Sequence, residues 1–238
     1  MKNKMKYVTF LILGSVIITA CSFLYQRREV STEEEVMQKW IFDQAKISSI
    51  KIEGKFALLQ GMDRTVKERL NFVLYYKNGD YRLIFAEYPG APTTILTKVG
   101  NQVELYETDI PYWMRKPHYF NADEDRLGIG FSAEEIPLLF FLLRESPQVD
   151  SLKKEYKNRV RIWSGKKNFY VVPDKNLLIL YSGPFKIKYS KWREVNGWER
   201  PKSIEVENSN IVSFMVEKEE IKNLPDTLFR FIMESKRY

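Results

Sequence analysis

Residues 70–85 read LNFVLYYKNGDYRLIF. Apolar side chains recur at every second position on both sides of Asn78-Gly79. A period of two places alternate side chains on opposite faces of a strand, and an Asn-Gly pair suits a tight turn because both residues tolerate positive φ. The stretch therefore predicts a β-hairpin with one apolar face.

The same alternation predicts a series of further strands. One run before the hairpin comprises Ile50, Ile52, Gly54, Phe56 and Leu58. Later strands are expected at residues 93–98, 102–107, 159–164, 168–172, 177–182, 186–195, 202–207 and 211–217. Because short links such as Asn196-Gly197 join several of them, neighbouring strands are expected to pair antiparallel.

Two stretches have helical periodicity. Apolar residues follow Ser31 and Thr32 at near-helical spacing, and residues 136–143 are apolar on nearly every side. Pro137 is best tolerated in a first helical turn, so the second helix is expected to begin at or near it. Since a helix that is apolar all round must be covered, the fold expected is α+β and mainly β. It is a curved antiparallel sheet forming an unclosed half-barrel, with helices covering the concave side.

The beginning of the chain resembles a bacterial lipoprotein signal. Lysines at positions 2, 4 and 6 precede a mostly apolar stretch, residues 7–19, and small residues then lead to Cys21, the only cysteine. This ending resembles a lipobox, and the stretch is shorter than the roughly 20 apolar residues that a membrane-spanning helix needs. We expect cleavage before Cys21 and acyl chains on its sulfur and new amino terminus. An ordinary secretion signal and an uncleaved anchor are the alternatives.

These observations predict a simple domain organisation. Residues 1–20 are expected to be the signal peptide, residues 21–30 a lipidated tether and residues 31–238 one domain. Hydrophobic residues make up 44% of the chain and aromatic residues 14%, which excludes a disordered protein. The net charge of +7 includes three signal-peptide lysines, so the mature chain is only mildly basic. That charge suits an anionic membrane surface and is too weak to indicate nucleic acid.

Catalytic and metal-binding patterns are missing from the sequence. His118 is the only histidine, so a His/Cys zinc cluster cannot form, and no Gly-x-Ser-x-Gly elbow accompanies it. The acidic run at residues 123–125 lacks calcium-loop spacing and is expected to be a solvated turn. We therefore expect no enzyme activity, no cofactor and no metal, with His118 an ordinary surface or packing residue.

One strand is basic enough to raise a nucleic-acid alternative. The basic residues are Lys186, Lys188, Lys191 and Arg193, with Tyr189 and Trp192 among them. Charge with interleaved aromatic rings is typical of single-strand binding surfaces. The alternation also fits a strand with one solvated basic face, and an exported lipoprotein rarely meets nucleic acid. We therefore prefer the solvated face.

The order of motifs resembles the LolA and LolB lipoprotein-localisation proteins over roughly residues 40–217. The stretches that carry the resemblance are GKFA at 54–57, DYRLIF at 80–85, YPGA at 88–91, LGI at 127–129, ESP at 145–147, Ile187 with Tyr189, and PKSIE at 201–205. They are patterns of glycine, proline and apolar spacing without a catalytic signature. The chain is more similar to LolB, because LolB is itself a lipoprotein. The resemblance implies a periplasmic half-barrel with helical lids.

The resemblance also implies an acyl-chain cavity. The expected lining is Phe56, Leu58, Phe72, Leu74, Leu83 and Phe85 from the sheet, with Leu139, Leu142 and Leu143 from the helix. The alternative is that these side chains simply fill each other as a core. In LolB an exposed leucine helps to pass lipoproteins into the membrane, and Pro89 occupies that place here. Tyr88 beside it suits a lipid–water boundary, although a rigid turn is the alternative.

The function expected is a membrane-anchored periplasmic receptor or carrier for acyl chains in lipoprotein localisation to the outer membrane. Its partners would be acyl chains of lipoproteins or lipids and the membrane that holds the anchor, with a periplasmic carrier protein as a further candidate and no nucleic acid. Ser22 after Cys21 favours the outer membrane, because aspartate there marks inner-membrane retention in enteric bacteria. The alternative function is a non-catalytic lipoprotein subunit of a cell-envelope assembly.

Overall fold

The computed structural model describes residues 43–60, 64–88, 91–108, 116–123, 132–142, 151–155, 159–164, 167–172, 177–182, 185–207 and 211–231. All of them belong to one compact unit, Val36–Tyr238. The expected signal peptide, tether and amino-terminal helix lie outside the described residues, except for a 3-10 turn, η2, at Asp43–Lys46. Cys21, Pro89 and Leu143 also lie outside them.

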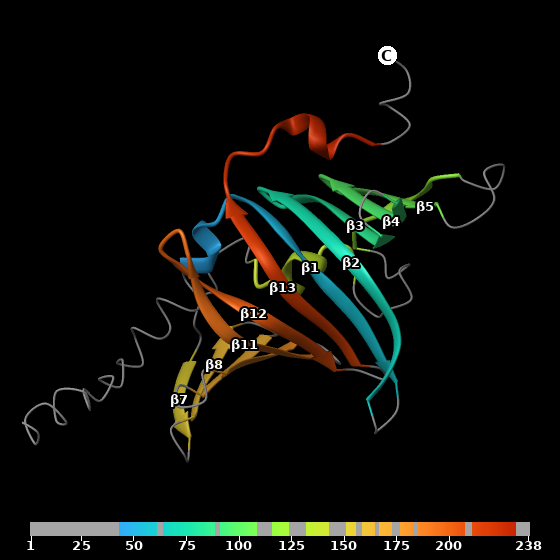
Figure 1. Ribbon diagram of the computed structural model, residues 1–238. Helices are drawn as coiled ribbons and strands as arrows, with labels where there is room; N and C mark the ends of the chain where they lie inside the picture. The colour runs from blue at the N-terminus through green and yellow to red at the C-terminus, as the bar shows by residue number, and fades with distance from the viewer. Residues whose placement is uncertain are drawn as a thin grey trace, which may run out of the picture. The chain divides into compact units, whose positions relative to one another are not determined.

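Thirteen antiparallel strands form one sheet within the described residues (Figure 1). The order is β6-β5-β4-β3-β2-β1-β13-β12-β11-β10-β9-β8-β7. The strands are β1 (Ser49–Gln60), β2 (Thr65–Lys77), β3 (Asp80–Tyr88), β4 (Ala91–Val99), β5 (Gln102–Glu107), β6 (His118–Asn121), β7 (Ser151–Glu155), β8 (Arg159–Ser164), β9 (Lys167–Val172), β10 (Leu177–Ser182), β11 (Phe185–Val195), β12 (Trp198–Glu207) and β13 (Ile211–Ile221). Pairing of β1 with β13 brings the first and last strands together, and β6 and β7 are the two edges of an open sheet.

The predicted strands and turns are confirmed. Each strand expected from alternation is present, and β2 and β3 form the predicted hairpin. Asn78 and Gly79 have φ of 50° and 94°, and Asn196 and Gly197 have φ of 51° and 83°. Positive φ at both central residues gives a turn whose twist matches that of the flanking strands. The sequence did not predict β6 or β7.

The second predicted helix is shorter than expected. It begins near Pro137 as predicted, but α3 (Ile136–Leu139) ends after four residues, and Phe141 has φ of 55°. A left-handed residue at that position cannot continue a right-handed helix. The described part of the chain around α3, residues 132–142, is called the α3 segment below, and the face of the sheet that it contacts is called the inner face.

Helical structure is sparse in the described residues, where η2, α3 and η5 (Asp226–Phe229) accompany the sheet. The fold is therefore mainly β with an open sheet, and of the expected helical cover these residues hold only short turns. Within the same residues, none of the helices has the length and apolar character needed to cross a membrane.

Charged side chains on β11 and β12 pair with each other. Lys186 donates to Glu207 at 2.7 Å, and Lys188 donates to Glu205 at 2.9 Å and also contacts Glu207. These glutamates neutralise Lys186 and Lys188, two of the four basic residues that raised the nucleic-acid alternative. The sequence alone indicated a solvated basic face. The structure shows that this face carries a ladder of ion pairs instead.

This ladder should make the free energy of unfolding depend on pH in the acidic range. Partial burial would raise the pKa of Glu207, but hydrogen bonds from Lys186 and Lys188 outweigh it and lower the pKa to about 2. A carboxylate with a lowered folded-state pKa contributes stability above its unfolded pKa, and the contribution is lost as pH falls toward the folded value. We expect the free energy of unfolding of Glu207→Gln to fall less than that of the wild type between about pH 5 and about pH 2 in urea titrations. The exposed Glu194→Gln variant is the control, and parallel curves for wild type and Glu207→Gln would contradict the prediction.

Candidate functional site

The deeper part of the expected lining is packed. Its members are at most 4% exposed and share one buried cluster: Phe72, Leu74, Leu83, Leu139 and Leu142. Phe140 joins them, with its ring centroid 5.3 Å from that of Phe72 and 5.1 Å from that of Phe214. The α3 segment therefore fills this part of the inner face with its own side chains.

The remaining described lining residues form a half-exposed rim. Phe56 and Phe85 are partly buried and pack against the cluster, with their ring centroids 5.2 Å apart. Leu58 is also half-buried and lies opposite Val212 of β13. We call Phe56, Leu58, Phe85 and Val212 the rim. Here the inner face presents apolar and aromatic surface that the protein covers only in part.

The predicted membrane loop begins beyond the rim. Tyr88, the last residue of β3, is 70% exposed. Tyr88 and Phe85 lie on the same strand, so β3 leads from the rim to this exposed ring. An amphipathic ring in that position has the chemistry of a residue at a lipid–water boundary.

Two buried tyrosines hold the α3 segment on the sheet. The Tyr189 hydroxyl donates to the carbonyl oxygen of Leu138 at 2.6 Å, and the Tyr81 hydroxyl donates to that of Ala133 at 2.9 Å. Burial raises the pKa of both hydroxyls well above its usual range, so both remain protonated donors. These contacts join side chains of the sheet to the backbone of the segment, so the segment can move without breaking the strand ladder.

A buried ion-pair cluster adds a third attachment. The Arg200 guanidinium donates to the Glu219 carboxylate at 3.0 Å and to the side-chain oxygen of Gln44 at 2.7 Å. It also donates to the carbonyl oxygens of Phe140 at 2.8 Å and Phe141 at 3.1 Å. Arg200 thus satisfies carbonyls left without helical partners where α3 ends. We call Arg200, Glu219 and Gln44 the Arg200 cluster.

His118 does not belong to this site. It is exposed on the edge strand β6, opposite Leu105. Among the described residues, no group of three or more His, Cys, Asp or Glu side chains is placed to hold a metal ion. Most of the inner face in the described residues is apolar contact area.

Comparisons with known proteins bear on the fold. No family model and no curated protein matches the sequence. A LolA-superfamily protein from Nitrosomonas europaea is similar in structure, with a TM-score of 0.54 and 11% identity over 80% of this chain and 96% of its own. A DUF1329-family protein from Desulfovibrio piger has a TM-score of 0.55 and 13% identity, over 79% and 92%. A domain assigned to outer membrane lipoprotein sorting, from Vibrio parahaemolyticus, has a TM-score of 0.53 and 9% identity, over 84% and 97%.

The chain has a LolA/LolB-like fold. The resemblance drawn from short motifs is therefore confirmed at the level of the fold, at identities too low to carry residue roles.

Sequence reasoning missed the Arg200 cluster of this LolA/LolB-like sheet. In β13, Phe214 and Val216 point inward, so strict alternation would place Lys218 on the inner face. A bulge interrupts the alternation, because Val216 pairs with Gly54 whereas Lys218 pairs with Glu53, the neighbouring residue of β1. The extra residue reverses the phase, and Glu219 turns inward instead. A sequence pattern carries no sign of such a bulge except a glycine in one strand, Gly54.

Proposed function

We propose that this protein is a membrane-anchored binding protein for the acyl chains of lipoproteins or lipids, acting as a receptor or carrier in lipoprotein localisation. The observation that carries the proposal is a LolA/LolB-like sheet whose inner face ends in a half-exposed aromatic rim. The proposed activity is binding and release, without a covalent step, a cofactor or a metal. Lipidated Cys21 would hold the protein on the periplasmic side of the outer membrane.

The rim supplies an entrance for an acyl chain. Burying each methylene contributes about 0.8 kcal/mol, so even a partly inserted chain gains substantial free energy. Deeper insertion requires the α3 segment to withdraw, because Leu139 and Leu142 occupy the deeper part of the inner face. In this proposal the α3 segment covers the inner face and is exchanged for cargo.

A charge at the rim tests the acyl-chain site. Phe85→Glu should weaken binding of a dansyl-labelled fatty acid by about tenfold or more, because a carboxylate resists transfer into apolar surroundings. Fluorescence titration measures the change. Tyr181→Glu is the matched control, since Tyr181 is 37% exposed but lies on β10. Unchanged affinity in a folded Phe85→Glu protein would remove the rim from the proposed site.

A charge at Tyr88 tests delivery separately. Tyr88→Glu should reduce transfer of a fluorescent lipid or lipoprotein to liposomes by several-fold and leave fatty-acid affinity unchanged, because the side chain is exposed beyond the rim. Transfer and binding are measured on the same preparation, with Tyr88→Phe as the conservative control. Equal transfer by Tyr88→Glu and wild type would contradict the loop assignment.

A second function is favoured by the packed deeper lining. If Phe72, Leu74 and Leu83 remain filled by the α3 segment, the fold serves as a non-catalytic lipoprotein subunit of an envelope assembly. Native mass spectrometry of protein from a membrane extract separates the two functions. Added mass from lipid supports the carrier, and a bare chain bound to another protein supports the subunit.

A further inference from the structure

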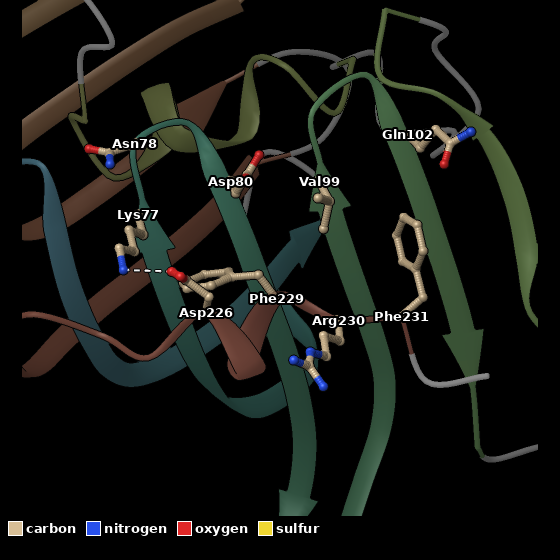
Figure 2. A pocket seen from close by; sticks show the side chains of 9 residues that line it. All are labelled: Lys77, Asn78, Asp80, Val99, Gln102, Asp226, Phe229, Arg230 and Phe231. Carbon is tan, nitrogen blue, oxygen red and sulfur yellow. Dashed lines mark hydrogen bonds and ion pairs between the residues drawn. The ribbon is translucent and has the colours of Figure 1, made fainter. Parts of the chain in front are cut away.

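A pocket lies at the other end of β2 and β3 from the rim. It has a volume of about 450 Å³, within the range of small-ligand sites. Figure 2 shows its walls: the turns after Lys77 and Val99 on one side and the C-terminal residues Phe229, Arg230 and Phe231 on the other. The pocket therefore forms between the sheet and the chain that follows β13.

The C-terminal segment, residues 222–231, is firmly attached around this pocket. Lys77 donates to the carbonyl oxygen of Leu224 at 2.8 Å and pairs with Asp226 at 2.6 Å. Arg82 donates to the carbonyl oxygen of Arg230 at 2.7 Å. Leu224 is buried. The attachments come from side chains on the face opposite the inner face, so the pocket is separate from the expected acyl-chain site.

The lining combines apolar rings with balanced charges. Phe229, Phe231 and Val99 supply apolar surface, and the Phe231 ring packs edge-on against Tyr119 at a centroid distance of 5.8 Å. Lys77 and Asp226 neutralise each other. Asp80 accepts one hydrogen bond, from the Gly100 amide at 2.8 Å, through a single carboxylate oxygen.

Arg230 leaves a positive charge at the same pocket. Its backbone carbonyl is engaged by Arg82, but among the described residues no ion pair or hydrogen bond of the Arg230 guanidinium is found. Figure 2 shows Asp80 and Arg230 at different sides of the pocket, with Phe229 between them in the view. In the part of the chain that the structure describes, this pocket thus holds one carboxylate and one guanidinium that do not pair with another charge.

We propose that this pocket binds a zwitterion that carries an ammonium and a phosphate group. Arg230 would bind the phosphate, because a guanidinium matches phosphate oxygens in charge and geometry. The ammonium would lie near Asp80, since cations are attracted to carboxylates. The ligand is either free phosphoethanolamine or the same group as a lipid headgroup.

Isothermal titration calorimetry of the full-length protein tests the proposal. Phosphoethanolamine should bind, and ethanolamine and inorganic phosphate should each bind about tenfold more weakly or worse, because each keeps only one charged contact. The variants test the two charged contacts. Arg230→Gln and Asp80→Asn should each weaken phosphoethanolamine binding by about tenfold. Lys222→Gln is the control and should bind as the wild type does, because this exposed lysine pairs with Glu220 outside the pocket. Asn at position 80 can still accept from the Gly100 amide, so the fold should be kept.

Some outcomes of this experiment identify the source of the ligand, and others overturn the proposal. Tighter binding of dihexanoyl phosphatidylethanolamine than of phosphoethanolamine identifies a lipid headgroup, and equal or weaker binding identifies the free zwitterion. Absence of phosphoethanolamine binding, equal binding of inorganic phosphate, or an unaffected Asp80→Asn variant would overturn the proposal. Arg230→Gln should leave fatty-acid binding at the rim unchanged, so this test and that of the acyl-chain site can fail independently.

Discussion

Glu219→Gln should lower the free energy of unfolding by about 3 kcal/mol or more, because breaking a buried ion pair leaves the partner charge uncompensated in a low-dielectric interior. The Glu219 side chain is fully buried, and Arg200 is 1% exposed. Arg193 contacts the same carboxylate at 3.4 Å, so a second guanidinium also loses its ion-pair partner and, among the described residues, keeps only its hydrogen bond to the Glu217 carbonyl oxygen. Chemical denaturation of the two purified proteins measures the difference.

The same strand offers a matched control. Glu217 pairs with Lys55 at 2.9 Å, but the two side chains are 51% and 65% exposed. Exposed pairs contribute about 0–1 kcal/mol, so Glu217→Gln should be nearly neutral. Similar losses in the two variants would show that the Arg200 cluster contributes no more than a surface pair.

The cluster should also control the α3 segment. Arg200 binds the Phe140 and Phe141 carbonyls, so loss of Glu219 should free the guanidinium and loosen the segment. Hydrogen exchange of the Phe141 and Leu142 amides, which bond to Leu138 and Pro137, should then speed up more than exchange of amides in β1. Uniform acceleration across both regions would indicate global destabilisation alone.

The sheet could be predicted because its strands repeat one local rule. Alternation places Phe72, Leu74 and Leu83 on one face, and Asn78-Gly79 fixes a turn by its own backbone preferences. β7 was missed because SLKKE contains no apolar alternation, and it is a strand through its pairing with β8. Pairing of this kind is a tertiary effect that a local pattern does not contain.

The candidate site was predictable only in part, for a related reason. Alternation assigns Phe56, Phe72 and Phe85 to the inner face without saying how far each is covered. Coverage depends on where the α3 segment lies along the strands, and its helix ends after Leu139, two residues before the left-handed Phe141. The division into a packed cluster and a half-exposed rim is therefore set by contacts distant in sequence, as is the inward turn of Glu219.

Gly54→Ala should destabilise the protein by about 3 kcal/mol or more, at or beyond the upper end of ordinary overpacking, because the obstruction is backbone. A Cβ at Gly54 would lie against the Met215 carbonyl oxygen, well inside van der Waals contact, and 3.0 Å from a Phe72 ring carbon. Met215 belongs to the strand paired with β1, so it cannot move aside without breaking the ladder. Thermal or urea unfolding of Gly54→Ala against wild type measures the loss.

Gly100→Ala separates lack of space from backbone strain. Gly100 has φ of +57°, but a Cβ there meets nothing within 4 Å, so alanine should cost only about 1–2 kcal/mol. If Gly54→Ala were as mild as Gly100→Ala, the close approach of β1 to β13 would not be a real constraint. A large loss at Gly54 would show that β1 and β13 approach each other too closely there for any side chain.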